Sequence, residues 1–153
     1  MQLDATDTTL LAYLQKNGEA TATELGAALN LSASQAGRRR QRLEEAGVIV
    51  GYRARLDPAK LGLAVQAFVQ IGLDRHSTEH GQSITRLLRT RPEIVSVWTM
   101  TGEADYLLRV FCPDLPALNR LIHEVLLAHP SVSRVQSQIV MDQPKADAAL
   151  PIF

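Results

Sequence analysis

The most concentrated set of reactive side chains in this chain is a run of arginines. Residues 37–42 read Gly-Arg-Arg-Arg-Gln-Arg, and two glutamates follow at Glu44 and Glu45. A guanidinium is a planar group that can donate two parallel hydrogen bonds to guanine O6 and N7 or to phosphate oxygens. Clustered charge on a helix is, however, more often a solvated face. The run by itself therefore leaves a nucleic-acid surface and an ordinary charged face equally open.

The residues before and after this run favour the nucleic-acid interpretation. Thr21 and Glu24 have the spacing of a capping box, in which each side chain accepts a bond from the other residue's backbone N–H. Ser32 can cap the next helix, which we expect to continue to about Ala46, with Gly47 in the left-handed position after it. Two capped helices joined by a tight turn, with the arginines in the second, are typical of a helix-turn-helix.

Positions along the second of these helices suggest different roles for its polar residues. Ser34, Gln35 and Arg38 lie in the first turns, the part of a recognition helix that usually meets base edges. Arg39 and Arg42 are better placed to bind phosphates, which position a protein on the duplex without reading its sequence.

A leucine-rich amphipathic helix precedes this pair, so we place a winged helix-turn-helix domain at residues 1–50. Residues 48–56 are strand-like and are expected to form the wing, with residues 51–61 as wing strand and linker. Arg53 and Arg55 alternate along that strand, where they can reach the flanking DNA backbone.

The second half of the chain contains an internal repeat with a period of 38 residues. Ile84, Leu87, Leu88, Arg91, Pro92, Ile94 and Val97 recur as Ile122, Val125, Leu126, His129, Pro130, Val132 and Val135. Each copy predicts a helix that ends at a proline and is followed by a strand, and strand-like runs precede the copies at Val65–Leu73 and Tyr106–Cys112. We therefore expect an α+β protein in which residues 62–142 form a ferredoxin-like βαββαβ domain, with residues 143–153 as a tail. The alternative is a chance match of two unrelated helix–strand pairs.

Two helices cover only one face of such a sheet, and the other face is not purely polar. Phe68 alternates with the most apolar positions of the first strand, and Trp98 falls in the second. A mixed, partly aromatic sheet face is typical of a contact between subunits. The sequence therefore predicts a homodimer formed through the second domain.

A short polar turn joins two apolar strands of that domain. Residues 101–105 read Thr-Gly-Glu-Ala-Asp, and glycine and aspartate occur in turns for conformational reasons alone. The same residues also suit a zwitterion, because free amides beside Gly102 can hold a carboxylate while Asp105 or Glu103 can bind an ammonium. The turn is therefore a candidate site for a small amino acid.

Composition and the remaining reactive residues exclude several classes of protein. A length of 153 residues allows one average domain or two small ones, and an apolar fraction of 46% is enough to build a core. The 16 basic and 16 acidic residues leave no net charge. It has no signal-peptide pattern and no apolar run near the roughly 20 residues of a membrane span, so we expect a soluble cytoplasmic protein without a membrane partner.

No pattern for metal or cofactor chemistry stands out. His76 and His80 have helical spacing, but no acidic third ligand follows them. Cys112 is the single cysteine and is expected to be a small apolar core residue. Trp98 and Met100 are expected in the sheet and its interface. Without a glycine-rich phosphate loop or a nucleophile elbow, we expect neither a cofactor nor an enzyme.

Four motifs spread over nearly the whole chain resemble the Lrp/AsnC family, the feast/famine regulators. They are Leu3-Asp4-x-x-Asp7-x-x-Leu10-Leu11, Leu31-Ser32, Arg39-x-x-Arg42-Leu43-Glu44-x-x-Gly47-Val48-Ile49-x-Gly51-Tyr52 and Gly102-x-x-Asp105-Tyr106. The resemblance implies a winged helix-turn-helix followed by a ferredoxin-like sensor domain, called RAM in this family. It also implies double-stranded DNA as a partner, amino acids as effectors, and dimers that associate into rings, usually octamers of four dimers.

The resemblance also assigns residues to two sites. The DNA-facing set would be Ser32, Ser34, Gln35, Arg38, Arg39 and Arg42. The turn of Thr101, Gly102, Glu103 and Asp105 would border an effector pocket between dimers. Two residues depart from the family pattern: Arg40 stands where many members have a β-branched apolar residue, and Gly37 lowers helix propensity by up to about 1 kcal/mol relative to alanine. Both departures leave open which arginine contacts a base.

The leading hypothesis is therefore a sequence-specific transcriptional regulator whose assembly or DNA affinity responds to an amino acid. The alternative is a metabolic sensor or scaffold subunit that binds a ligand through its second domain and contacts other proteins through its first. An enzyme is a weaker third alternative, because no titratable pair lies at catalytic spacing.

Overall fold

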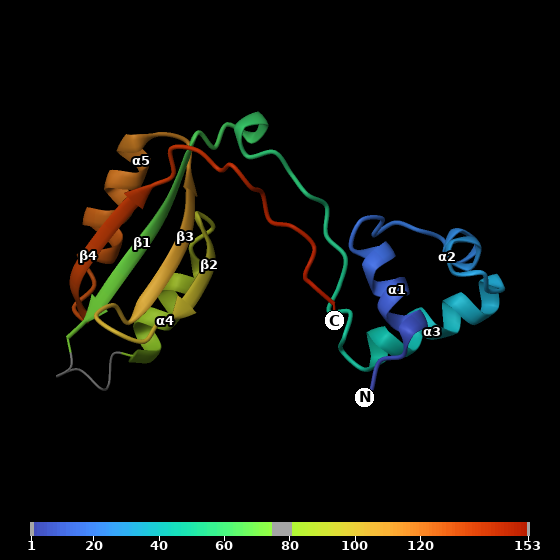
Figure 1. The fold of residues 1–153 in the computed structure, drawn as a ribbon. Coiled ribbons are helices and arrows are strands. Elements are labelled where there is room, and N and C mark those ends of the chain that lie inside the picture. Colours follow the sequence, from blue (N-terminus) through green and yellow to red (C-terminus); the bar gives the residue numbers. More distant parts are fainter. Residues whose placement is uncertain (1, 75–80, 153) are drawn as a thin grey trace. The chain divides into compact units, whose positions relative to one another are not determined.

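The structure of the chain is a computed structural model that describes residues 2–74 and 81–152. The chain groups into two compact units (Figure 1), namely Met1–Arg55 together with Pro144–Phe153, and Leu56–Gln143. Each unit has a hydrophobic core of its own, as expected of a domain that folds around its own apolar residues.

Three helices build the first unit: α1 (Ala5–Leu14), α2 (Ala22–Leu29) and α3 (Ala33–Glu45). Each begins at a capping box. The caps predicted at Thr21 and Ser32 are confirmed, and α1 has a further box made by Asp4 and Asp7. The core of the unit is formed by residues from these helices and the connection between α1 and α2: Leu10, Leu11, Leu14, Ala20, Leu25, Ala36 and Leu43.

The predicted wing strand is wrong. Gly47 takes the left-handed conformation expected after α3, with φ of 70°, but residues 48–57 form no strand. The alternating pattern favours an extended chain, yet a strand persists only when a neighbouring strand accepts its backbone hydrogen bonds. None of the described residues of this unit is in a strand, so Arg53 and Arg55 are exposed on an unpaired segment.

The second unit has the predicted order of strands and helices. After a 3₁₀ turn at Ala59–Leu61 come β1 (Val65–Leu73), α4 (Gly81–Thr90), β2 (Ile94–Thr99), β3 (Tyr106–Cys112), α5 (Leu115–Arg120), η3 (Leu121–Leu126) and β4 (Val132–Ile139). The strands pair antiparallel in the order β2-β3-β1-β4. This is the ferredoxin-like arrangement, and the two copies of the repeat occupy equivalent places in it, which confirms the prediction.

The two faces of the sheet differ as the alternating pattern of β1 predicts. Ala67, Val69 and Ile71 are fully buried in the core, which also contains Ile84 of α4 and Leu118 of α5. Figure 1 shows α4 and α5 on the same side of the sheet. No helix within residues 2–74 and 81–152 covers the opposite face.

One feature of the second helical segment is absent from its sequence pattern. After α5 the chain continues as the π-helix η3, in which the Leu127 N–H bonds the Ile122 carbonyl at 2.8 Å. Leu121 and Leu126 are five residues apart and both buried. An ordinary α-helix would turn these two side chains well away from each other, so the wider turn lets both enter the core.

Candidate nucleic-acid interface and effector turn

The turn between α2 and α3 is tight because one residue in it has no side chain. Gly26 is buried, and a Cβ at this position would lie 2.7 Å from the Leu31 carbonyl oxygen and 3.1 Å from the Ala33 nitrogen. Asn30 ends α2 in the left-handed conformation, with φ of 54°. Together these residues bring α3 directly against α2, as a helix-turn-helix requires.

One side of α3 faces solvent along most of its length. Ser34, Arg38, Gln41 and Glu45 succeed one another at spacings of three or four residues, and all four are exposed. Gln41 donates from Nε2 to Oε1 of Glu45 at 2.8 Å. Arg38 forms no ion pair within the described part of the chain. We name these four residues the outward stripe; Gln41 was not predicted for the site, although its spacing from Ser34 and Arg38 is visible in the sequence.

Ser32 and Gln35, both predicted to face DNA, also shape the start of α3. The Ser32 hydroxyl oxygen accepts a bond from the Gln35 backbone N–H at 3.2 Å, and Gln35 Oε1 accepts one from the Ser32 N–H at 3.0 Å. Both residues remain exposed. They therefore fix where the helix begins and lie at its amide-rich end, which is favourable for an anion.

Arg39 and Arg42, predicted to bind phosphates, are bonded to carboxylates at the start of α1. Arg42 Nη2 donates to the two oxygens of Asp7 at 2.7 and 2.6 Å, and Arg39 Nη1 donates to Asp7 Oδ1 at 2.9 Å and to Asp4 Oδ2 at 2.6 Å. The Asp7 side chain is 1% exposed, whereas those of Arg39 and Arg42 are 29% and 50% exposed. The two arginines therefore neutralise a buried carboxylate and tie α3 to α1.

These contacts also perturb the ionisation of the groups involved. The hydrogen bond from Arg39 holds the pKa of Asp4 below its usual value, and the bonds to Asp4 and Asp7 raise the pKa of Arg39. The sequence does contain a signal for this cluster, because Asp7 falls on the same helical side as Leu10 and Leu14, where an acid needs a partner. Its partners lie 32 and 35 residues away, so no local pattern identifies them.

The Arg40 side chain bonds other residues of the first unit instead of extending freely into solvent. Its Nε donates to Glu44 Oε1 and its Nη1 to the Ala20 carbonyl, both at 2.9 Å. The guanidinium lies over the ring of Tyr52, 4.6 Å from the ring centroid. Hydrogen bonds from Arg40 and Tyr52 lower the pKa of Glu44. Among the four arginines of the run, Arg38 is thus the one that forms no ion pair with another described residue.

The candidate effector turn lies between β2 and β3 and is fastened by Asp105. The Asp105 carbonyl accepts from the Met100 N–H at 2.9 Å, and its own N–H donates to the Ile71 carbonyl at 2.8 Å. Its carboxylate oxygen Oδ2 accepts from the Leu73 N–H at 2.7 Å. Asp105 therefore has a structural role, because it joins the turn to the end of β1.

Thr101, Gly102 and Glu103 are exposed at the tip of this turn. Gly102 has φ of 108°, a conformation that other residues rarely adopt, and a Cβ there would have nothing within 4 Å. Arg134 of β4 lies 3.6 Å from a carboxylate oxygen of Glu103 and donates to its carbonyl at 3.4 Å. The predicted effector residues thus lie together on an open turn, which a further surface would have to cover to enclose a ligand.

The sheet face opposite the helices carries aromatic and apolar side chains. Phe68 pairs with Arg109 across β1 and β3, and Trp98 pairs with Leu107 across β2 and β3. Directly paired residues share a face, and Leu107 and Arg109 share one because they are two residues apart on β3. Phe68 and Trp98 therefore lie on the same side of the sheet, as predicted. Trp98 is 45% exposed. This face has the composition of a subunit contact.

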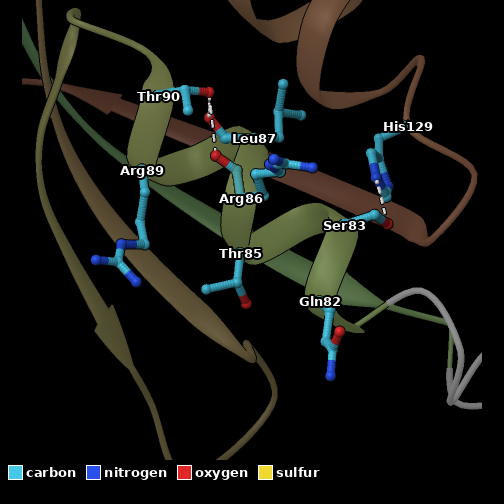
Figure 2. A pocket seen from close by; sticks show the side chains of 8 residues that line it. All are labelled: Gln82, Ser83, Thr85, Arg86, Leu87, Arg89, Thr90 and His129. Atoms are coloured by element: carbon cyan, nitrogen blue, oxygen red, sulfur yellow. Dashed lines mark hydrogen bonds between the residues drawn. The ribbon is translucent and has the colours of Figure 1, made fainter.

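A wide hollow of about 1190 Å³ lies over the polar side of α4 (Figure 2). It is lined by Gln82, Ser83, Thr85, Arg86, Leu87, Arg89, Thr90 and His129. His129 Nδ1 accepts from the Ser131 N–H at 3.2 Å, and Nε2 lies 3.1 Å from the Ser83 hydroxyl oxygen. Since Nδ1 accepts, Nε2 carries the proton and donates to Ser83. The histidine thus has a hydrogen-bond partner at both ring nitrogens, and the hollow is an open depression rather than an enclosed cavity.

Residues suited to metal or nucleophilic chemistry are not grouped in the part of the chain that the structure describes. Among residues 2–74 and 81–152, no three His, Cys, Asp or Glu side chains lie close enough together to bind a metal ion. His76 and His80 lie outside the described residues. Cys112 is fully buried in the core, and this burial raises the pKa of its thiol, as expected of an apolar filler.

Comparison with known proteins decides the class. Residues 3–44 match the AsnC-type helix-turn-helix domain, and residues 66–150 match the Lrp/AsnC ligand binding domain. The chain belongs to the Lrp/AsnC family.

Other Lrp/AsnC proteins match this chain over nearly its whole length. The DNA-binding transcriptional activator DecR of Escherichia coli K12 is 36% identical over 98% of this chain and 99% of its own. The leucine-responsive regulatory protein of the same strain is 33% identical over 98% and 92%. A transcriptional regulator from Neisseria meningitidis, solved in complex with L-Met, superposes with a TM-score of 0.94 at 35% identity over 98% and 97%. An AsnC-family regulator from Agrobacterium tumefaciens gives 0.89 at 33% identity over 97% of each chain.

Membership of the Lrp/AsnC family gives each unit its class. The first unit contains a DNA-binding helix-turn-helix, the second is a ligand-binding domain, and the protein is a transcriptional regulator rather than an enzyme. Among the described helices, none is both long and apolar enough to cross a membrane.

Proposed function

We propose that this Lrp/AsnC regulator reads DNA through the outward stripe of α3, with Arg38 as the residue that contacts a base. The observation that carries the proposal is that the four arginines of the run differ in their bonding partners. Arg39 and Arg42 bond Asp7, Arg40 bonds Glu44, and Arg38 is exposed in the first half of the helix without an ion pair among the described residues. A guanidinium in that position can bond guanine bidentately in the major groove.

The other residues of the predicted DNA-facing set take supporting roles in this proposal. Ser34 and Gln41 flank Arg38 on the outward stripe and contact neighbouring base edges. Ser32 and Gln35 place the amide-rich start of α3 beside a phosphate. Arg42 bonds Asp7 through Nη2 alone, so its remaining N–H groups can reach a phosphate, while the more enclosed Arg39 mainly orients the helix.

The test compares the affinity of full-length variants for a cognate operator and for random duplex. Arg38→Ala is expected to weaken operator binding by about 1–3 kcal/mol and to leave random binding nearly unchanged. Arg89→Ala is the matched control, because it removes the same charge from an exposed position on α4. If Arg38→Ala discriminates operator from random duplex as well as the control does, Arg38 does not read a base.

We further propose that the second domain binds an amino acid at the turn of Thr101, Gly102, Glu103 and Asp105, and that it assembles through the open face of its sheet. The amides beside Gly102 would hold the carboxylate, and Glu103 or the second carboxylate oxygen of Asp105 would bind the ammonium. The complex of the Neisseria relative with L-Met supports an amino acid as the ligand class. Phe68 and Trp98 would form the dimer contact, and four dimers in an octamer would cover the open turn.

A thermal-shift screen of the twenty amino acids tests this second proposal. A ligand present at 100 times its Kd adds about 2.7 kcal/mol to the stability of the native state. Gly102→Val is expected to abolish the shift given by the best ligand, because a side chain there blocks approach to the backbone amides and strains a left-handed residue. An unchanged shift in Gly102→Val would place the ligand elsewhere.

A further inference from the structure

The first unit contains an apolar groove, and a segment from the far end of the chain lies along it and forms part of its lining. Leu150–Ile152 lie along α1 and along Val48–Tyr52, the stretch that follows α3, and these surfaces together enclose about 420 Å³. Figure 1 shows this end of the chain returning to the segment that leaves α3. The contact lies within one compact unit, which includes both Met1–Arg55 and Pro144–Phe153.

The segment is held by its backbone and by one apolar side chain. Gln15, just after α1, donates from Nε2 to the Leu150 carbonyl at 3.0 Å and accepts from the Leu150 N–H at 2.6 Å. Ile152 packs against the core of the unit, whereas the Leu150 side chain is 76% exposed. The side-chain amide of Gln15 thus satisfies both backbone groups of one residue, as a neighbouring strand would.

This docking gives the first unit two anchored connections to the second. The chain leaves the first unit after Arg55 and re-enters it at Pro144. Val48–Tyr52, which forms one wall of the groove, is also the beginning of the outgoing connection. The docked segment therefore packs against the exit of the helix-turn-helix and anchors the returning chain beside it.

We propose that Leu150–Ile152 of the same chain dock in this groove as a second tether of the helix-turn-helix, on which binding to a two-half-site operator depends. A dimer that engages two half-sites gains affinity from the effective concentration of its second helix-turn-helix. An undocked tail leaves each helix-turn-helix on a single connection with a wider range of orientations, which lowers that effective concentration. Binding to one half-site does not use it. This consequence for DNA rests on the function proposed above.

Two full-length variants undock the segment from opposite sides. Gln15→Glu keeps the shape of the side chain but replaces the donor to the Leu150 carbonyl by an acceptor, and Ile152→Asp places a charge on the apolar anchor. Met141→Ser is the control, because Met141 is 98% exposed and lies outside the groove. None of these residues belongs to α3.

Hydrogen exchange followed by mass spectrometry reports docking, and duplexes with one or two half-sites report the tether. In Gln15→Glu and Ile152→Asp we expect peptides covering α1 and Val48–Tyr52 to exchange roughly three- to tenfold faster than in wild type and Met141→Ser. We expect the two-half-site Kd to rise by a similar, roughly three- to tenfold, factor while the half-site Kd stays constant. Unchanged exchange in both variants would overturn the docking, and an unchanged two-half-site Kd would overturn the tether. A wild type that bound neither duplex would refute the DNA-binding proposal, and exchange would still decide the docking.

A chemical cross-link identifies the chain to which the segment belongs. Cysteines placed at Val50 and Leu150, two exposed residues that line the groove, can be joined by a short bifunctional reagent, while the buried Cys112 with its raised thiol pKa stays unreacted. Denaturing gels and peptide mapping are expected to show the linked peptides within one chain. A cross-linked dimer as the main product would overturn the assignment to the same chain.

Discussion

Gly26 offers the most direct test of how the helix-turn-helix is built. A methyl group at this position would lie 2.7 Å from the Leu31 carbonyl oxygen, 3.1 Å from the Ala33 nitrogen and 3.2 Å from the Ser32 carbonyl carbon. All three atoms belong to the backbone of the turn, so relief requires α2 and α3 to move apart. Inserting a methyl group into a packed interior costs about 1–3 kcal/mol, and a backbone that cannot yield places the cost near the upper end.

Gly37 provides the matched control for this substitution. Both glycines lie in helices, so replacing either by alanine recovers up to about 1 kcal/mol of helix propensity. A Cβ at Gly37 would meet only the Ala22 methyl group, at the ordinary distance of 3.7 Å. We therefore expect Gly37→Ala to raise the free energy of unfolding by up to about 1 kcal/mol and Gly26→Ala to lower it by roughly 2 kcal/mol.

Denaturant unfolding monitored by circular dichroism measures both variants in the full-length protein, with operator binding as a second readout. The difference between the two alanine variants isolates the clash, because the propensity gain is common to them. If Gly26→Ala is within about 0.5 kcal/mol of Gly37→Ala, which is the spread of unremarkable substitutions, the tight turn is not what holds α2 against α3.

Three further predictions follow from the contacts of the same chain. Asp7→Asn keeps the size of the side chain but removes the charge that Arg39 and Arg42 bind, so we expect the free energy of unfolding to fall by roughly 1–3 kcal/mol in thermal melts, and a wild-type melt would show that the cluster contributes nothing. Arg39 lowers the pKa of Asp4, and the Thr21 N–H lowers the pKa of Glu24. A carboxyl whose pKa is lower in the folded state stabilises the fold above its unfolded pKa of about 4, and this stabilisation is lost as the pH falls through the folded pKa. We therefore expect the melting temperature to drop between about pH 5 and 3, and to drop less steeply in Asp4→Asn. Phe68→Glu places a charge on the open sheet face and is expected to yield monomers in sedimentation at micromolar concentration, whereas Thr85→Glu on the exposed side of α4 should leave the assembly intact.

The local signals in the sequence predicted most of the fold correctly. The caps at Thr21 and Ser32, the left-handed Gly47 and the bounds of β1 and β3 each depend on residues within one element, and the structure has all of them. The predicted wing strand was wrong because the alternating residue types at 48–56 indicate only a preference for extended backbone. A strand also needs a neighbouring strand to accept its backbone hydrogen bonds. The π-helix at Leu121–Leu126 was missed because its repeat partner, α4, satisfies the same apolar pattern with ordinary helical turns.

The candidate DNA site was harder to resolve because its arginines differ in long-range partners rather than in type. Arg38 and Arg39 are adjacent and chemically identical, yet of these two only Arg39 bonds Asp4 and Asp7. Arg40 likewise has partners, because its guanidinium lies over the Tyr52 ring and donates to the Ala20 carbonyl. These partners become visible only once α1, α2 and α3 are packed, so the sequence located the helix and the structure distinguished its side chains.

Selection from a pool of random duplexes tests the central proposal most directly, namely that the outward stripe of α3 reads DNA with Arg38 at a base. Wild-type protein and Arg38→Ala are each used to enrich duplexes, which are then sequenced. We expect the wild type to enrich a two-fold symmetric motif, and Arg38→Ala to enrich the same motif with the preference lost at one guanine in each half-site. An Arg38→Ala motif identical to that of the wild type would contradict the proposal.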